Sequence, residues 1–477
     1  MNIELRDYIK KLEKSGKLIH VTEELETRFE ISAAMRYIAE PMDKVVIFDK
    51  VKGYDIPVVG NLFGSREQLA IAFGVSKDKL EEAYVNRANN PVKPKIVKDS
   101  PAQEVVIDKD VDILKVIPVL THNEKDAGPY MTSAITIARD PETGIRGMGL
   151  HRIQIKDKDT VGIYLATPPL SHFLTKAEQL NKPLEIAIVS GVAPAIFFAA
   201  VFMVGRFGMT MDKFEIAGGF AQEPIELVKC RSVDVEVPSN AEFILEGEVI
   251  PHRREKEGPF GESTGYYLAY DNPVAKIKTI TYRSKPIYHA LMPFSPEEES
   301  LIGVMMLPNL LNQLQDDLPE IKIRQVSFMA LGELCMAKIS KRFEEDAPKL
   351  IDYLFSHPFT KIVVVTDEDV NIYKPEEVAW AVSTRVRPDK DVIIKNGLPG
   401  LMIDPSVGSL EVTSDLSLQV GKTAKIGIDA TKPLEELERF ERIDVPMEVK
   451  EKILNLVEKK KGFGIRGRSQ KRRKEVV

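Results

Sequence analysis

Two glutamates five residues apart are the chain's strongest candidates for acid–base chemistry. Glu257 and Glu262 lie in the segment EGPFGESTGYY, residues 257–267. Its three glycines and one proline predict a tight, non-helical loop whose backbone can approach a ligand closely. Turn geometry can aim both carboxylates at one point, and paired carboxylates in a poorly solvated pocket raise each other's pKa, so that one can donate a proton near neutral pH. The alternative is a surface loop with two solvated acids.

A second candidate is Arg152, in the segment GMGLHRIQI, residues 147–155. If this segment is a strand, Ile153 and Ile155 share one face while Arg152 and Gln154 share the other, where the arginine is available to a polar site. A guanidinium is always charged and its fork matches carboxylate or phosphate, which suits an anionic substrate or cofactor. An ordinary ion-pair partner in a strand is the alternative.

His172 and Glu226 are candidates for metal ligation. The histidine lies in PPLSH, residues 168–172, and the glutamate in EPIELVK, residues 223–229. An imidazole and a carboxylate can supply half of a Mn²⁺ or Mg²⁺ shell, with water or phosphate oxygens completing it. Nothing in their spacing requires a metal, so ordinary structural roles are the alternative.

The first part of the chain, residues 1–103, has the pattern of an α/β domain. Apolar residues recur at helical spacing in some stretches and form short β-branched runs in others. The expected helices cover 5–12, 31–39 and 66–83, and the expected strands cover 18–21, 44–48 and 56–59. A Pro/Lys-rich stretch at 90–95 predicts a linker.

The middle part, residues 104–300, is mostly β and predicts a split β-barrel. Alternating apolar residues at 233–237 and 243–249 flank Pro238-Ser239-Asn240, which is a hairpin signature. Residues 276–283 alternate in the same way and predict a further strand. The uncharged stretch 186–205 is long enough to resemble a membrane span. We interpret it instead as a buried strand at 186–189 and a core helix at 195–204, opened by Pro194.

The last part returns to alternating helices and strands. A connecting helix is expected within 301–320, followed by an α/β domain over 321–445 and a helix with a basic tail over 446–477. The domain's expected strands are 334–339, 362–365 and 391–394, and its helices 344–355 and 374–385. Buried β-branched runs separated by helices favour a mainly parallel sheet. The chain is therefore predicted to be α/β, or α+β overall.

Composition limits the remaining possibilities. The chain has 477 residues, 43% hydrophobic and 29% charged, as in soluble globular proteins. A net charge of −6 argues against a body built to grip nucleic acid, and the charged amino terminus has no apolar signal region, which predicts a cytoplasmic protein. Cys230 and Cys335 lack metal or redox spacing and are expected to be core thiols. Nine Lys or Arg between residues 459 and 474 predict a solvated end, with a nucleic-acid arm as the alternative.

A collinear series of motifs resembles the UbiD family, decarboxylases that use prenylated FMN. In order, the segments are DAGP at 126–129, the Arg152 strand, LSH at 170–172, ELVKC at 226–230, EVP at 236–238, AE at 241–242, LEG at 245–247, EGPFGE at 257–262, DEDVN at 367–371 and WAVSTR at 380–385. The resemblance covers nearly the whole chain except the basic tail. It implies that the central split β-barrel is the flavin-binding domain.

The resemblance also implies roles for the candidate residues. Arg152, Glu257 and Glu262 would form a catalytic triad, in which Glu262 delivers a proton to the product carbon, Arg152 holds the substrate carboxylate or tunes the flavin, and Glu257 fixes Arg152. The reverse assignment, with Glu257 as the proton donor, is the alternative. Lys361 is a weaker candidate for contact with the flavin phosphate.

The resemblance further implies Mn²⁺ (or Mg²⁺), often with K⁺, held by His172 and Glu226 and bridging to the flavin phosphate. One position departs from the family. An asparagine ligand normally stands five residues before the triad arginine, and here that position is Gly147. Water or a backbone carbonyl would have to replace the amide, or the cation would bind more weakly.

The expected activity is reversible, non-oxidative decarboxylation of an α,β-unsaturated or aromatic acid. Loss of CO₂ from an sp² carbon leaves a carbanion that needs an electron sink, which side chains cannot supply. Possible substrates are anhydromevalonate phosphate and hydroxybenzoate-type acids. The expected partners are a flavin prenyltransferase and further copies of the chain, in a dimer or hexamer. Abundant Lys and Glu are typical of thermophiles. The rival functions are a flavin-independent, metal-dependent hydrolase or dehydratase and a nucleic-acid-binding protein.

Overall fold

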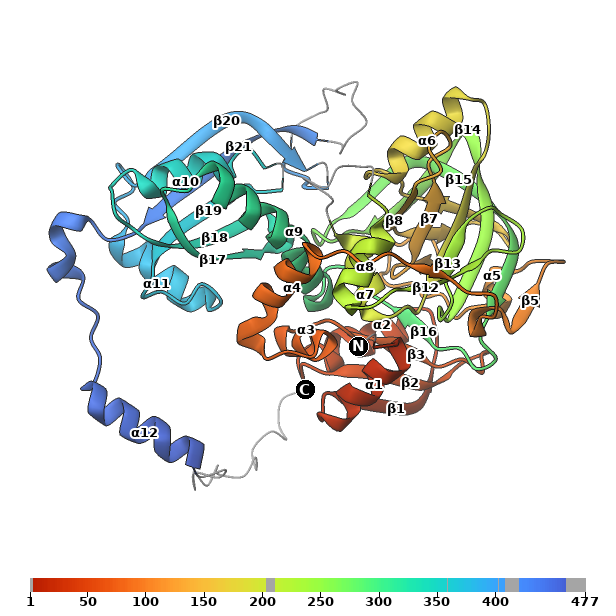
Figure 1. The fold of residues 1–477 in the computed structure, drawn as a ribbon, viewed down its shortest axis with the longest axis horizontal. Coiled ribbons are helices and arrows are strands. Elements are labelled where there is room, and N and C mark those ends of the chain that lie inside the picture. Colours follow the sequence, from red (N-terminus) through yellow and green to blue (C-terminus); the bar gives the residue numbers. More distant parts are fainter. Residues whose placement is uncertain (1–2, 203–210, 358, 402, 408–419, 460–477) are drawn as a thin grey trace. The chain divides into compact units, whose positions relative to one another are not determined.

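The computed structural model describes residues 3–202, 211–357, 359–401, 403–407 and 420–459 (Figure 1). The chain divides into one large unit, residues 1–431, and a small carboxyl-terminal unit, residues 432–477. The predicted basic tail, residues 460–477, lies outside the described residues. The described part of the chain contains no helix long and apolar enough to cross a membrane, as expected for 186–205.

The amino-terminal region has the expected alternation of helices and strands. Its helical segments are α1 (Leu5–Lys14), α2 (Glu30–Ala34), a π-helix (Met35–Ala39), α3 (Arg66–Phe73), a 3₁₀ turn (Lys77–Lys79) and α4 (Leu80–Ala88). Its strands are β1 (Leu18–Leu25), β2 (Val45–Val51) and β3 (Val58–Gly60). The sheet has the order β1-β2-β3-β16, and β16 (Tyr288–Ala290) comes from far along the chain. The amino-terminal sheet therefore depends on residues outside 1–103.

The middle region is dominated by a nine-stranded sheet whose pairings are antiparallel. Its strands, in spatial order, are β6 (Tyr130–Met131), β9 (Ile153–Ile155), β10 (Thr160–Ile163), β15 (Tyr267–Tyr282), β14 (Phe243–Gly261), β11 (Leu184–Ser190), β7 (Ile135–Arg139) and β8 (Arg146–Leu150), while β5 (Val105–Ile107) pairs with β15. Among the described residues this path is open between β6 and β8. The long β14 and β15 form its central pair (Figure 1).

The hairpin predicted around residues 238–240 is wrong. β13 (Glu236–Pro238) pairs with β12 (Glu226–Lys229), which also pairs with β4 (Lys95–Ile96) in a separate three-stranded sheet. β14 instead pairs with β15 and β11. Both strands alternate as a hairpin would, but residues 239–242 carry the chain from one sheet to the other. β4 likewise shows that the predicted linker ends in a short strand.

Helices join the middle and amino-terminal regions into one core. They are a 3₁₀ turn (Pro101–Gln103), α5 (Ile113–Val116), α6 (Leu170–Gln179), α7 (Pro194–Val201) and α8 (Lys213–Ala221). The rings of Phe73 on α3 and Phe198 on α7 stack 5.0 Å apart, and those of Tyr84 on α4 and Phe220 on α8 stack 4.7 Å apart. The core helix expected at 195–204 is present up to Val201, and residues 203–204 are not described.

The carboxyl-terminal part begins with a long helix, α9 (Pro296–Asp317), which starts five residues before the expected connecting helix. A five-stranded sheet follows, in the order β17 (Lys322–Met329), β18 (Leu334–Ser340), β19 (Ile362–Asp367), β21 (Val420–Ala430) and β20 (Val392–Leu401). Its helices are a 3₁₀ turn (Ala330–Gly332), α10 (Asp346–Leu354) and α11 (Pro375–Arg385). The three central strands are parallel as predicted, whereas both edge strands are antiparallel.

The small unit, described up to residue 459, contains a 3₁₀ helix (Leu434–Phe440) and α12 (Met447–Lys459). α12 corresponds to the helix expected before the basic tail. Both cysteines are free; Cys335 is buried as expected, whereas Cys230 is only partly buried.

Candidate active site

Of the two candidate glutamates, Glu257 lies in a long strand and Glu262 lies in the predicted loop, directly after that strand ends. β14 includes Glu257 and runs to Gly261, with Glu257 opposite Tyr270 of β15. The register shifts after Glu257, and Gly258 there has a φ of +103°. A Cβ on this glycine would lie 2.6 Å from the Leu268 carbonyl oxygen, so only glycine fits the bulge. The chain turns only after Gly261.

Arg152 lies between β8 and β9 and joins the two glutamates. Its Nη2 lies 2.6 Å from Glu257 Oε2 and its Nε lies 3.1 Å from Glu257 Oε1, a bidentate pair. Its Nη1 contacts the carboxylate of Glu262. Glu257 is completely buried, and the other two side chains are nearly so. One guanidinium thus stands between two carboxylates at a site withdrawn from water.

Aromatic rings and an amide hold this cluster in place. The rings of Tyr164, Phe260 and Tyr270 lie 4.6, 5.1 and 5.7 Å from Arg152 Cζ, within the range of cation–π attraction. Asn272 Nδ2 donates to Glu257 Oε2 at 2.8 Å. Burial raises the pKa of Tyr270 to about 12, so its hydroxyl stays neutral. The motifs did not point to these residues, because all but Phe260 lie outside the segments examined for chemistry.

Glu262 is linked to a third acid, Glu298, which is partly buried. Ser263 N donates to Glu262 Oε2 at 3.0 Å, and Ser263 Oγ lies 2.5 Å from Glu298 Oε1 in the first turn of α9. Glu298 Oε2 accepts from Phe294 N at 2.7 Å. Burial raises the pKa of Glu298 to about 7. A protonated carboxyl is therefore available one hydroxyl away from Glu262.

The sequence contains a signal at Glu298, but it suggests another role. Ser295 and Glu298 have the spacing of a capping box, in which the glutamate reaches back to the serine's backbone. Ser295 Oγ does accept from Glu298 N at 3.3 Å. The Glu298 carboxylate, however, binds Phe294 N and Ser263 rather than the Ser295 backbone. The connection from Glu298 through Ser263 to Glu262 is therefore visible only in the folded structure.

A cavity of about 310 Å³, which we call the acidic cavity, begins at the residue after Glu262. Its wall consists of Ser263, Thr264, Tyr266, Phe294, Ser295, Pro296, Glu299, Ala330, Glu333, Asp404 and Pro405. This volume is at the lower end of small-molecule sites. The cavity has room for a small ligand of about one ring.

Buried polar atoms near the triad have unused hydrogen-bonding capacity. Within the described structure, Gln154 Oε1 and His122 Nδ1 have no hydrogen-bond partner. Gln154 is two residues from Arg152, and the His122 ring lies 6.5 Å from the Phe260 ring. Burial lowers the pKa of His122 to about 3, so the ring is neutral. Buried groups of this kind are usually satisfied by a partner, and the polar edge of a flavin is suited to them.

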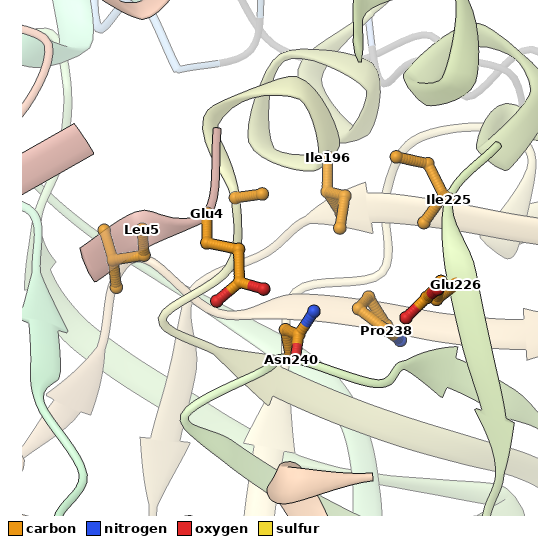
Figure 2. A pocket seen from close by; sticks show the side chains of 8 residues that line it. Glu4, Leu5, Ile196, Ile225, Glu226, Pro238 and Asn240 are labelled. Atoms are coloured by element: carbon orange, nitrogen blue, oxygen red, sulfur yellow. The ribbon is translucent and has the colours of Figure 1, made fainter. Parts of the chain in front are cut away.

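The predicted metal ligands, His172 and Glu226, come from α6 and β12. Glu226 on β12 forms an ion pair with Lys95 at 2.8 Å, and it lines a cavity of only about 20 Å³ with Glu4 and Asn240 (Figure 2). The ring of His172 on α6 makes no hydrogen bond to another described residue. In the described ranges no three His, Cys, Asp or Glu side chains could hold a metal ion.

Position 147 shows why the expected asparagine is missing. A side chain there would place its Cβ 2.6 Å from the Phe173 ring and 2.6 Å from Pro169, both near His172. An asparagine would collide with them, and contacts under 3.0 Å require the neighbours to shift. A side chain at position 147 would thus need Pro169 and Phe173 to shift, and metal binding by His172 and Glu226 stays a prediction.

Lys361 lies just before β19 and is already occupied. Its Nζ lies 2.5 Å from Asp404 Oδ2 and contacts Ser406 Oγ. Asp404 belongs to the wall of the acidic cavity, so Lys361 stands behind that wall. Its contact with a flavin phosphate stays a prediction.

Comparison with known proteins identifies the family. Models described as domains of 3-octaprenyl-4-hydroxybenzoate carboxy-lyase match in three stretches: the amino-terminal domain at 9–87, the Rift-related domain at 95–296 and the carboxyl-terminal domain at 299–430. An anhydromevalonate phosphate decarboxylase from Methanothermobacter thermautotrophicus is 32% identical over 92% of this chain and 99% of its own length. The chain belongs to the UbiD family. A phenolic acid decarboxylase from Sedimentibacter hydroxybenzoicus is 35% identical over 90% of this UbiD-family chain and 92% of its own length.

Solved structures of UbiD-class enzymes share the fold. The enzyme HmfF from Pelotomaculum thermopropionicum, in complex with FMN, has a TM-score of 0.86 and 38% identity, covering 95% of this chain and 99% of that one. An evolved dimeric form of HmfF, in complex with prenylated FMN, has a TM-score of 0.82 at 38% identity, covering 94% and 98%.

Family membership confirms the predicted fold class and the predicted reaction class. The protein is a carboxy-lyase of the UbiD type, and its relatives are named as decarboxylases. The two rival functions, a flavin-independent hydrolase or dehydratase and a nucleic-acid-binding protein, gain no support from these comparisons.

Proposed function

We propose that this UbiD-family protein decarboxylates an α,β-unsaturated or aromatic carboxylic acid with the help of prenylated FMN. The observation that carries the proposal is Arg152, held between two buried carboxylates beside a cavity. When bound, the flavin supplies the electron sink that side chains lack. The FMN and prenylated-FMN complexes of HmfF support this cofactor.

Each member of the triad has a separate task. Glu257, fixed by Asn272, holds Arg152 through a bidentate pair that sets the direction of its Nη1, which faces Glu262. Nη1 binds the substrate carboxylate, which competes with Glu262 for that position. Glu262, released from the arginine, then takes up a proton and delivers it to the carbon that has lost CO₂.

The proton for Glu262 has a short route. Glu298 gives its proton to Ser263 Oγ, which passes its own proton to Glu262. The Ser263 Oγ–Glu298 Oε1 distance is 2.5 Å, and Ser263 Oγ lies 3.4 Å from Glu262 Oε2. Buried, linked carboxyls of unequal surroundings are suited to such transfer.

The decisive experiment compares protein produced with and without a flavin prenyltransferase, the expected supplier of the cofactor. We expect the first preparation to carry a modified flavin and to release CO₂ from members of a panel of unsaturated and aromatic acids, and the second to be inactive. Equal activity from both preparations would overturn the proposal.

Four further features of the family resemblance belong to this proposal. We expect a homo-oligomer, a cytoplasmic location, and bound Mn²⁺ (or Mg²⁺) with K⁺. None of the steps above is routed through a metal. Metal analysis of the dialysed protein and its mass in solution test these expectations separately from decarboxylation.

A further inference from the structure

Decarboxylation consumes a proton, yet the triad that would deliver it is buried. A carboxylate R–COO⁻ leaves as R–H and CO₂, so each turnover takes up one proton from solution. Glu257 is completely buried, and Arg152 and Glu262 are nearly so. Glu298, which supplies Glu262 through Ser263, must therefore be reprotonated after every turnover.

A cluster of charged and polar side chains adjoins Glu298 at the start of α9. Phe294 connects the two, because its backbone N donates to Glu298 Oε2 at 2.7 Å and its carbonyl oxygen accepts from Arg36 Nη2 at 3.2 Å. We call this group the α9 cluster, and its members are Arg36, Glu40, His289 and Glu297.

Glu40 brings the α9 cluster to the protein surface. It directly follows the π-helix Met35–Ala39 and stands four residues after Arg36, so both side chains lie on one helical face. Glu40 is partly exposed, and Tyr37 and Ile38 just before it are exposed. Turns of π-helix are frequent at functional sites. A proton from solution can therefore reach the cluster at Glu40.

Glu297 is close to both Glu40 and Glu298 and is itself almost completely buried. Its Oε1 accepts from Phe63 N at 3.1 Å and lies 3.4 Å from His289 Nε2. Its Oε2, like Glu40 Oε1, is buried and has no hydrogen-bond partner within the described structure. Buried polar atoms are rarely left in this state without a reason, and proton transfer is one such reason.

Glu40 and Glu298 are acids of similar strength. Burial raises the pKa of each to about 7. The charge of Glu297 raises the pKa of both, while the charge of Arg36 lowers it. Two acids with similar pKa values near the working pH can exchange a proton without a large barrier.

The charged residues that follow Glu40 in the sequence are bound elsewhere. Asp43 Oδ2 accepts from Lys17 Nζ at 2.8 Å. Lys44 Nζ donates to the carbonyl oxygen of Gly16. Neither residue contributes to the shift in the pKa of Glu40, which has its causes in burial, Arg36 and Glu297.

We propose that Glu40 is the point at which protons enter the active site. It takes a proton from solution and passes it, by way of Glu297, to Glu298. Glu298 then passes it through Ser263 to Glu262. Each group gains one proton and loses one, so the route returns to its starting state and the balance is R–COO⁻ + H⁺ → R–H + CO₂.

This inference rests on the proposed function, because it extends the route that supplies Glu262. The alternative is direct entry from the acidic cavity, whose wall includes Ser263. In that case Glu40 would have no part in proton uptake, and its replacement would leave the reaction unchanged.

The first test is the pH profile of decarboxylation by the prenylated-FMN-loaded Glu40→Gln protein. We expect kcat to fall by about tenfold or more at pH 8, and by less at pH 6, where protons are more abundant in solution. KM should not change, because Glu40 does not contact the substrate. Added imidazole should restore the rate at pH 8 by carrying protons to the site. Identical pH profiles for the variant and the wild type would overturn the inference.

Two further variants separate proton uptake from a structural effect. Glu320→Gln makes the same change of charge at an exposed position just after α9 and should keep the wild-type profile. Glu40→Asp keeps an acid and should retain most of the rate at pH 8. A loss in Glu40→Asp as large as that in Glu40→Gln, or a loss that imidazole does not relieve, would mean that Glu40 acts only on the structure.

Proton entry can also be followed without turnover. The infrared C=O band of a protonated carboxyl shifts when its hydrogen is exchanged for deuterium, and Glu298→Gln identifies the band of Glu298. After transfer into D₂O at pH 6, we expect this band to exchange about tenfold more slowly in Glu40→Gln than in the wild type or Glu320→Gln. Equal exchange in all three proteins would contradict the inference.

The inference and the proposed function can fail separately. If exchange at Glu298 slows in Glu40→Gln but the prenylated-FMN protein releases no CO₂ from any acid, the decarboxylase proposal fails and the entry point stands. If CO₂ is released and Glu40→Gln changes neither the pH profile nor the exchange, the decarboxylase stands and protons enter elsewhere.

Discussion

Two glutamates, Glu257 of the triad and Glu298 in the first turn of α9, have opposite surroundings. Glu257 is completely buried, and both of its carboxylate oxygens accept hydrogen bonds from the Arg152 guanidinium. Glu298 has only neutral hydrogen-bond donors in the described structure, Ser263 Oγ and Phe294 N, and burial raises its pKa to about 7. Burial thus raises the pKa of a carboxyl that has no cation among its hydrogen-bond donors.

The largest expected effect is on the reaction rate, at Glu262, which contacts Arg152 on one side and is linked through Ser263 to Glu298 on the other. Glu262→Gln keeps the size and hydrogen bonds of the side chain but removes the acid. We expect decarboxylation to fall by roughly 10²–10⁴-fold, the usual contribution of general acid catalysis. Melting temperature should barely change, and solvent hydrogen exchange at the product carbon should slow in parallel. Near-normal rates for Glu262→Gln with a loss for Glu257→Gln would mean that Glu257 is the proton donor.

The second effect is on stability at the paired acid. Glu257→Gln leaves Arg152 buried with Glu262 as its remaining partner, and a half-compensated buried charge is expensive. We expect a loss of about 3 kcal/mol in the free energy of unfolding, measured with urea. A loss near zero would mean that the bidentate pair does not fix the arginine, contrary to its proposed task.

The third effect depends on pH, at the unpaired acid. A folded-state pKa of about 7, above the ordinary glutamate pKa of 4.5, means that the folded protein holds the Glu298 proton more tightly than the unfolded chain. Wild-type stability should thus fall relative to Glu298→Gln as pH rises from 4.5 through 7, by up to about 3 kcal/mol at pH 8. Urea unfolding of both proteins at pH 4.5 and pH 8 measures this. A difference that is the same at both values would contradict the assignment.

The smallest effect is expected at Glu226, the glutamate that the family resemblance assigned to a metal. Its carboxylate is partly exposed and paired with Lys95, and exposed ion pairs contribute little. We expect Glu226→Ala to leave the flavin content nearly unchanged. The unfolding free energy should change by no more than about 0.5 kcal/mol. A large loss of bound flavin in this variant, matched by a loss of metal, would restore the metal site.

The triad residues could be predicted because family motifs and local chemistry point to the same three side chains. Their geometry could be predicted only in part. The sequence of residues 257–267 predicts a loop, but residues 257–261 are a bulged strand end and the chain turns only from Glu262 onward. Gly258 is needed there for a close backbone approach inside a strand, which composition alone cannot distinguish from a turn.

Long-range pairing accounts for most of the remaining errors. The alternation at 233–249 is genuine, but only the register of Val237 with Val228 and of Phe243 with Tyr282 shows that two sheets are involved. Glu298 could not be predicted for a different reason. Its spacing from Ser295 suggests only a role at the start of α9, and nothing in the sequence indicates its contact with Ser263. A contact between side chains far apart in the sequence leaves no periodic pattern in that sequence.

The position of β16 far along the chain affects how the protein folds during synthesis and which truncated fragments can fold. β3 has β2 on one side and receives Tyr288–Ala290 on the other. A ribosome must therefore synthesise about 290 residues before the first sheet can close, and until then the β3 edge is open to pairing with other chains. A fragment ending near residue 103 should be poorly soluble, whereas one that continues past β16 and α9 should be able to complete its first sheet.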